Sequence, residues 1–411
     1  MVERLLIERI GHRGDGVVAG GAEPVYVPGS LPGETVEAEA VPGQPDRRHL
    51  LKVETPSAER IVPICPHFGV CGGCALQHWQ TSAYRAWKRD LVVTALRHEG
   101  VDAPVSDLID AHGAGRRRAV FHAHGAQGVL QVGFSAARAH RIIGIDRCPV
   151  LAKSLDGAIA AAWAIAEVLL PTKKPLDIQV TATDAGLDID VRGSGALNAA
   201  LMTALARVAA AQNLARLTRH GELIAQSRAP ALRIGTATVL LPPAAFLQAT
   251  AEGETVLSRL VLEACGGSAS AADLFAGVGP FTLRLARQSR IAAADDDDLA
   301  LAALKRAAAL TTGLKPVTVE RRDLFKNPLT AAELNRFDAV VFDPPRQGAA
   351  AQSRELAASK VAVVVAVSCN TASLARDLRF LIDGGYRLTA VTPVDQFRYS
   401  AHVEIVARLE K

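Results

Sequence analysis

The pattern that most restricts the fold lies toward the C-terminus, where short apolar segments alternate with stretches of helical periodicity. Segments with the composition of buried strands occupy residues 271–275, 291–294, 339–342 and 361–367. Strands separated by helices in this order are typical of a parallel sheet with helices on both faces. The pattern predicts a doubly wound, Rossmann-like α/β domain over residues 231–411. Ligands of such sheets bind at the carboxyl ends of the strands, so the residues that follow each apolar segment are the first candidates for a functional site.

The rest of the chain must supply further domains, because 411 residues exceed what one hydrophobic core usually accommodates. In the first part, strand-like segments recur between glycines and prolines, as in a small β-barrel. The middle mixes helical patterns at 82–99 and 196–211 with strand patterns at 178–181 and 187–191. We therefore predict three domains: a β-barrel over 1–54, a central α+β domain over 55–230 and the α/β domain over 231–411.

Composition is that of a soluble globular protein. No segment reaches the roughly 18 consecutive apolar residues of a membrane-spanning helix, so we expect a cytoplasmic protein, and we take it to be a monomer. Thiols stay reduced in that compartment, and the six cysteines therefore need an explanation other than disulfides. The formal charge of +4 only weakly favours a polyanionic partner. The three arginines at 116–118 would suit either phosphate contacts or a solvated loop.

Four cysteines have the spacing of a metal site. Cys65, Cys71 and Cys74 lie close together among glycines, and Cys148 follows far downstream. Three thiolates on one tight loop and a fourth from a distant segment suit a four-cysteine centre. From spacing alone, zinc and a 4Fe–4S cluster both remain open.

A glycine-rich loop follows the strand predicted at 271–275. Gly277 and Gly279 permit a sharp turn into a helix and let a ligand approach the backbone. The third glycine of the dinucleotide fingerprint is missing, although NAD remains a rival ligand. Asp295 ends the next strand, where a carboxylate can accept hydrogen bonds from a ribose. Asp323 follows the third strand, and it would suit either an adenine contact or the N-cap of a helix.

The next two strands end in reactive groups. Asp343 precedes two prolines and can accept hydrogen bonds from a cofactor or a base. Cys369 follows strand 361–367 near a helix start, a position that suits reactivity, whereas a buried structural thiol is the alternative. A thiolate that adds to carbon 6 of uracil makes carbon 5 nucleophilic enough to take a methyl group. A base must then remove the carbon 5 proton, and Glu404 on the last strand is the candidate.

Together these segments closely resemble the bacterial RNA (uracil-5-)-methyltransferase family, in its 23S rRNA branch. The similarity runs through nearly the whole chain, and the first segment resembles a TRAM domain, an OB-like RNA-binding barrel. The resemblance implies a class I domain that binds S-adenosylmethionine, and a structured RNA substrate, 23S rRNA. It implies Cys369 as nucleophile, Glu404 as base and a 4Fe–4S cluster on the four cysteines. It implies cofactor contacts from Gln248, Phe275, Gly277, Gly279, Asp295, Asp323 and Asp343. It implies a uracil site made by Phe246, Gln248 and Asp343.

The sequence departs from the family pattern at three positions. Asp295 stands where Glu is usual, Pro280 replaces a polar residue, and Thr371 follows Asn370 where Pro is typical. Three rival functions remain: a tRNA uridine-5-methyltransferase, a non-catalytic RNA-binding assembly factor and a cytosine-5 methyltransferase. The barrel and the cluster cysteines disfavour the tRNA branch. The presence of both Cys369 and Glu404 disfavours an idle active site.

Overall fold

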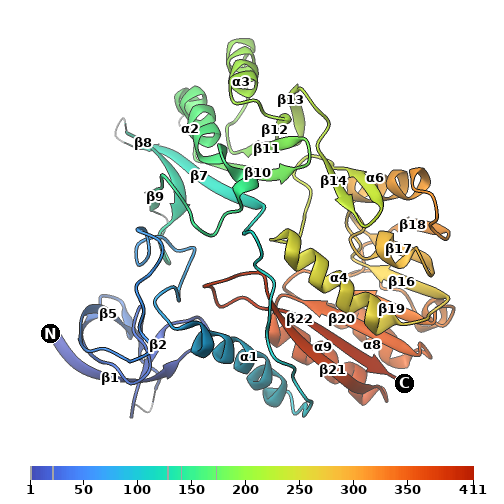
Figure 1. Ribbon diagram of the computed structural model, residues 1–411, viewed down its shortest axis with the longest axis horizontal. Helices are drawn as coiled ribbons and strands as arrows, with labels where there is room; N and C mark the ends of the chain where they lie inside the picture. The colour runs from blue at the N-terminus through green and yellow to red at the C-terminus, as the bar shows by residue number, and fades with distance from the viewer. Residues whose placement is uncertain (1, 21–22, 127–128, 140, 173) are drawn as a thin grey trace.

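The computed structural model describes residues 2–20, 23–126, 129–139, 141–172 and 174–411. Figure 1 shows a small barrel near the N-terminus, a central sheet carrying two helices, and a larger α/β region that contains the C-terminus. Within the part of the chain so described, no helix combines the length and apolar character needed to cross a bilayer.

The first five strands form a closed barrel in the order β1-β2-β3-β5-β4. Its interior is filled by Ile7, Val27, Val36 and Ala38. The chain order and the closure agree with the small barrel predicted from the sequence, whereas kinship with TRAM domains stays a prediction. The strands are β1 (Val2–Ile10), β2 (Gly16–Val18), β3 (Tyr26–Val27), β4 (Thr35–Val41) and β5 (Gln44–Thr55).

Helix α1 (Thr81–His98) joins the barrel to the α/β region, as Figure 1 shows. Trp79, Tyr84 and Trp87 pack with Ile10 and Leu31 of the barrel in one apolar cluster. Farther along the helix, Val92 and Leu96 belong to the core of the α/β region. The aromatic residues of this segment therefore fix the barrel next to the C-terminal sheet.

The central region is one seven-stranded sheet in the order β13-β12-β11-β10-β7-β8-β9. The helix expected over 196–211 begins later, at Ala199, because the side chain of Asn198 caps it by accepting a hydrogen bond from Leu201 N. The strands are β7 (Arg118–Ala126), β8 (Val129–Ser135), β9 (Ile142–Gly144), β10 (Leu176–Thr183), β11 (Gly186–Arg192), β12 (Arg216–Arg219) and β13 (Glu222–Gln226). The helices are α2 (Ala158–Leu169) and α3 (Ala199–Ala211), and a hairpin of β14 (Ala231–Ile234) and β15 (Ala237–Leu240) follows.

The α/β region contains an eight-stranded sheet in the order β18-β17-β16-β19-β20-β22-β21-β6. Its first five strands are parallel, and separate apolar cores cover its two faces, as a doubly wound sheet requires. The strands are β16 (Ser270–Leu274), β17 (Arg290–Asp295), β18 (Val317–Arg321), β19 (Ala339–Phe342), β20 (Val363–Ser368), β21 (Arg387–Asp395) and β22 (Glu404–Glu410). The helices are α4 (Ala251–Cys265), α5 (Thr282–Leu285), α6 (Asp298–Leu310), α7 (Ala331–Leu334), α8 (Ala350–Ala358) and α9 (Thr371–Asp383).

Two details of this sheet matter for the site. The last strand, β22, inserts antiparallel between β20 and β21, so the start of β22 lies at the carboxyl end of β20. The edge strand β6 (Ile109–Asp110) comes from the chain that precedes the central sheet, and it pairs with β21. The predicted domain boundaries stay a prediction, and β6 shows that the chain before residue 231 also contributes to the C-terminal sheet.

Candidate active site

The pairing of β20 with β22 brings the two predicted catalytic residues together. Ser368 lies opposite Ile405 in the antiparallel register, so Cys369, one residue beyond β20, and Glu404, the first residue of β22, meet at the same edge of the sheet. Asp343 follows β19, the neighbour of β20 on the other side. Three groups that are far apart in sequence therefore line the carboxyl end of the central strands.

Both carboxyl groups of the site are buried and resist ionisation. Burial raises the pKa of Glu404 to about 7, against the opposing effects of a hydrogen bond from Gln396 and of nearby cations, which include Arg346 and Arg118. Burial, followed by repulsion from Glu404, raises the pKa of Asp343 well above its ordinary value. A carboxylate whose pKa is near neutrality can take up a proton during a reaction, which is the property that a general base requires.

Side-chain amides connect the two carboxyl groups. Nε2 of Gln396 donates to Oε1 of Glu404 at 3.0 Å and to Oε1 of Gln248 at 2.7 Å. Nε2 of Gln248 in turn donates to Oδ2 of Asp343 at 3.1 Å. Gln248, predicted from the sequence to contact both cofactor and uracil, is thus placed at the centre of the site.

The Cys369 thiol resists ionisation. Burial, followed by the carboxylates of Glu404 and Asp343, raises its pKa to about 11, and the guanidinium of Arg346 acts in the opposite direction. Helix α9 starts two residues later, and the side chain of its N-cap, Asn370, accepts hydrogen bonds from Ala372 N and Ser373 N. The N-terminus of this helix and Arg346 therefore favour the thiolate, whereas the two carboxylates oppose it.

Phe246 presents its ring to solvent next to these groups. It is 65% exposed, although most phenylalanines are buried. The guanidinium of Arg118 lies 4.4 Å from the centre of the ring, close enough for a cation–π contact. Gln248 is only two residues away, so the exposed ring borders the site where a flat base could stack.

The glycine loop forms the adjoining part of the site. Gly277 N donates to Oδ2 of Asp295 at 2.8 Å, which ties the loop to the end of β17. Gly279 has a φ of +87°, and a Cβ atom there would lie 2.3 Å from Cδ1 of Leu304. Phe275 adopts a φ of +64°, a rare conformation for a bulky residue and one that clusters at ligand sites.

Asp323 lies beside this loop and caps a turn. Its Oδ1 accepts hydrogen bonds from Phe325 N and Lys326 N, both at 3.1 Å. The alternative of a helix N-cap is wrong in this form, because Asp323 caps a turn and the next helix, α7, begins only at Ala331. The adenine contact stays a prediction. The rings of Phe275 and Phe325 are 5.3 Å apart and border the same loop.

Comparison with known proteins supplies the family. Residues 243–411 match the family model described as tRNA (Uracil-5-)-methyltransferase. An uncharacterized RNA methyltransferase of Brucella suis is 45% identical over 99% of this chain and 98% of its own length. The chain belongs to the RNA uracil-5-methyltransferase family. A more distant relative, the 23S rRNA (uracil(1939)-C(5))-methyltransferase RlmD of a Shewanella species, is 29% identical over 98% of this chain and 94% of its own.

A solved structure supports the fold of this RNA uracil-5-methyltransferase. The tRNA (uracil-54, C5)-methyltransferase of Pyrococcus abyssi, in complex with S-adenosyl-L-homocysteine, superposes with a TM-score of 0.76 and covers 99% of both chains at 22% identity. That likeness establishes the class I methyltransferase fold. The prediction of an RNA uracil-5-methyltransferase is confirmed at this level, whereas S-adenosylmethionine as the methyl donor of this chain stays a prediction.

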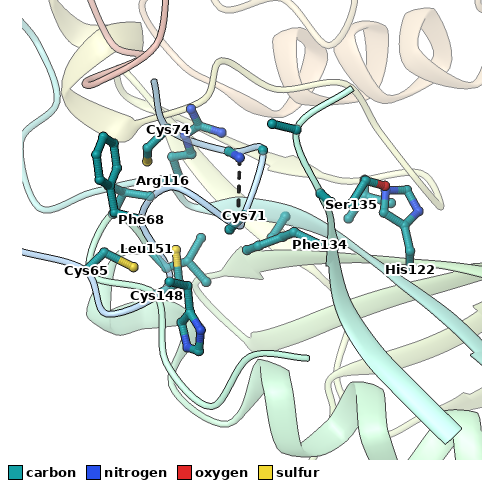
Figure 2. A pocket seen from close by; sticks show the side chains of 18 of the residues that line it. Cys65, Phe68, Cys71, Cys74, Arg116, His122, Phe134, Ser135, Cys148 and Leu151 are labelled. Carbon is teal, nitrogen blue, oxygen red and sulfur yellow. Dashed lines mark hydrogen bonds between the residues drawn. The ribbon is translucent and has the colours of Figure 1, made fainter. Parts of the chain in front are cut away.

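The four cysteines predicted to hold a cluster line one cavity of about 480 Å³, between the segment that precedes α1 and the central sheet. Figure 2 shows Cys65 and Cys148 with their sulfur atoms on the same side of this cavity and Arg116 beside Cys74. Burial raises the pKa of the Cys74 thiol to about 11. As they stand, no three His, Cys, Asp or Glu side chains of the described residues are arranged to hold a metal ion. The cluster therefore stays a prediction.

Reasoning from the sequence did not identify the buried residues that contact the side chains of the site from the interior of the protein. Gln396 and Asp395 lie at the end of β21 and are both buried. Asp395 accepts a hydrogen bond from the hydroxyl of Tyr84 at 2.7 Å and is paired with Lys88, whose side chain is completely buried in α1. Gln396 could have been found from the sequence as a polar residue at the end of a predicted strand. Nothing in the sequence around Tyr84 and Lys88 indicates that they contact Asp395.

Proposed function

We propose that this protein methylates carbon 5 of a uridine in 23S rRNA through a transient covalent bond between Cys369 and the base. The observation that carries the proposal is the strand register that sets Cys369 next to Glu404, with Asp343 one strand away. A nucleophile and a group able to hold a proton at neutral pH are the two functions that the reaction needs.

The residues would act in order. The exposed ring of Phe246 would stack on the flipped uracil, and the remaining N–H of the Gln248 amide would donate a hydrogen bond to its edge. The sulfur of Cys369, after losing its proton, would bond to carbon 6, and the electron pair displaced from the double bond would make carbon 5 nucleophilic. Bound S-adenosylmethionine supplies an electrophilic methyl group. Carbon 5 would take this methyl group as the carbon–sulfur bond of the donor breaks. Glu404 would then remove the proton from carbon 5, and the electron pair of that carbon–hydrogen bond would restore the 5,6 double bond and expel the Cys369 thiolate.

The RNA class rests on sequence similarity along the whole chain. RlmD of Shewanella acts on 23S rRNA by its name and is 29% identical to this chain, whereas the Pyrococcus abyssi enzyme is named for tRNA and is 22% identical. The whole-chain likeness to the latter keeps tRNA as the second candidate. An RNA-binding assembly factor without activity is disfavoured, because Cys369, Glu404 and Asp343 are all present at one edge of the sheet.

Transfer of tritiated methyl groups to transcripts tests the proposal. We expect transfer to 23S rRNA fragments and not to tRNA, and its loss in Cys369→Ala. Cys265, buried in α4 away from the site, provides the matched control, and Cys265→Ala should retain transfer. Glu404→Gln should accumulate an RNA–protein adduct that survives denaturing gels. Transfer that persists without Cys369 would rule out the mechanism, and transfer to tRNA alone would assign the other substrate.

We also propose that Cys65, Cys71, Cys74 and Cys148 would hold a 4Fe–4S cluster. All four line the same cavity, and Arg116, which also lines it, favours the thiolate forms of Cys74 and Cys148. A cation beside these thiols suits a centre that carries negative charge when bound. Protein purified without oxygen should contain about four iron and four sulfide ions per chain, as the cluster formula requires. Stoichiometric zinc without iron would reject the cluster.

A further inference from the structure

We propose that Gln396 is a positioning residue that holds the carboxylate of Glu404 and the amide of Gln248 in their working orientations. This inference rests on the proposed function, because it assigns to Gln396 a role in support of the base. Gln396 follows β21, is 0% exposed, and cannot reach solvent or substrate itself. Its amide contacts two of the residues that line the site, Glu404 and Gln248.

The orientation of the Gln396 amide is fixed by the backbone. The N–H of Thr250 can only donate, and it lies 3.3 Å from Oε1 of Gln396. The oxygen must therefore face Thr250, and Nε2 must face the oxygens of Glu404 and Gln248. If the amide were rotated by 180°, all three hydrogen bonds would be lost. Its oxygen would then face the acceptor oxygens of Glu404 and Gln248.

This orientation propagates to the next amide. Because Oε1 of Gln248 accepts from Gln396, Nε2 of Gln248 must point toward Asp343, and its second hydrogen remains for a ligand in the site. Both carboxyl groups then receive hydrogen bonds from amides. Among the described residues, Gln396 is the only side chain that donates a hydrogen bond to Glu404.

Neighbouring contacts hold Gln396 rigidly. Asp395, the preceding residue, is bound by Tyr84 and Lys88, and Nζ of Lys88 also donates to Phe397 O at 3.1 Å on the other side. The helix α4 packs closely against the amide, since a Cβ atom on Gly253 would lie 2.5 Å from Oε1 of Gln396. A group fixed by its surroundings in this way can preorganise a base before substrate binds.

Other charges around Glu404 cannot replace this contact. The cations Arg346, Arg118 and Lys88 favour its ionised form from a distance, whereas Asp343 and Cys369 face it across the strand ends and oppose ionisation when charged. The hydrogen bond from Gln396 also favours the ionised form and lowers the pKa of Glu404. Its removal should make the base harder to ionise and less well aimed.

Gln396→Met tests the role, because methionine keeps the length of the side chain and removes the donors. We expect methyl transfer at neutral pH to fall by about tenfold to a hundredfold, as for a lost hydrogen bond to a charged group. The acid limb of the pH–rate profile should move upward by about one unit. The covalent RNA adduct should accumulate, since removal of the carbon 5 proton becomes slow.

Gln352→Met is the matched control. Gln352, a residue of α8, is also fully buried, but its amide pairs with the backbone N–H and carbonyl of Leu329 and with neither Glu404 nor Gln248. Its substitution should lower stability without moving the pH profile or trapping adduct.

Two outcomes for Gln396→Met overturn the inference: transfer with the unmodified rate and pH profile, or a loss equal at every pH without adduct, as a structural defect would give. Transfer by Cys369→Ala would instead reject the proposed function.

Discussion

Glu404→Gln should make the protein more stable, although it removes the proposed base. The pKa of Glu404 is raised by burial from 4.5 to about 7 in the folded protein. Glu404 therefore ionises more readily in the unfolded chain than in the folded protein. Below pH 4.5 it is protonated in both states and does not affect the free energy of unfolding, but as the pH rises toward 7 its ionisation in the unfolded chain lowers that free energy. A shift of this size corresponds to roughly 3 kcal/mol at most. Gln cannot ionise, and its side-chain oxygen can still accept the hydrogen bond from Gln396.

Thermal unfolding between pH 4.5 and pH 8.5 measures the effect. The gain of Glu404→Gln over the unmodified protein should be near zero at the acid end and level off above pH 7, at up to about 3–4 °C in Tm for a chain of this length. Glu263→Gln is the control, because Glu263 is an exposed partner of Arg259 on α4 and should change stability by no more than about 0.5 kcal/mol. A lower Tm for Glu404→Gln, or the same change in Tm at both ends of the pH range, would refute the conclusion that burial raises the pKa of Glu404.

Two further substitutions probe the glycine loop and the support behind the site. Gly279→Ala should weaken S-adenosylmethionine binding about tenfold in calorimetry, because residue 279 has a positive φ and its new Cβ atom would clash with Leu304. Gly277→Ala is the control and should weaken binding less, because a Cβ atom there would have no neighbour within 4 Å. Equal losses in the two variants would contradict the clash. Lys88→Met should cost about 3–5 kcal/mol in denaturation experiments, because the buried carboxylate of Asp395 keeps the hydrogen bond from Tyr84 but loses its cation partner. Adding Asp395→Asn should recover part of that loss, and a purely additive double variant would contradict the pairing.

Several features could be predicted from the sequence because their signals are local. The alternation of apolar segments with helical stretches indicated the doubly wound sheet, and the glycine and proline spacing indicated the barrel. The position of Cys369 beyond a buried strand placed it at a ligand-binding edge. Each of these depends on neighbours within a few residues, which is the range over which side-chain periodicity and turn preferences act.

Local signals left other features undecided or wrong. The helix was expected from residue 196 because the alanine-rich composition begins before Asn198. It begins at Ala199, since Asn198 is its N-cap. Asp323 fitted a cap and a cofactor contact equally, and only the coordinates show its hydrogen bonds to the turn. The assignment of Gln248 came from family resemblance, since nothing in its surroundings along the chain marks it.

The sequence alone determined which residues could react; the tertiary structure decided which of them meet. Glu404 reaches Cys369 because β22 inserts antiparallel beside β20, a register that neither segment specifies by itself. Gln396, Gln248 and Asp343 form a chain only after segments about a hundred residues or more apart pack together. Burial then changes the pKa of Glu404 and Asp343, because low polarity around a carboxylate is a property of the packed core and not of the residue.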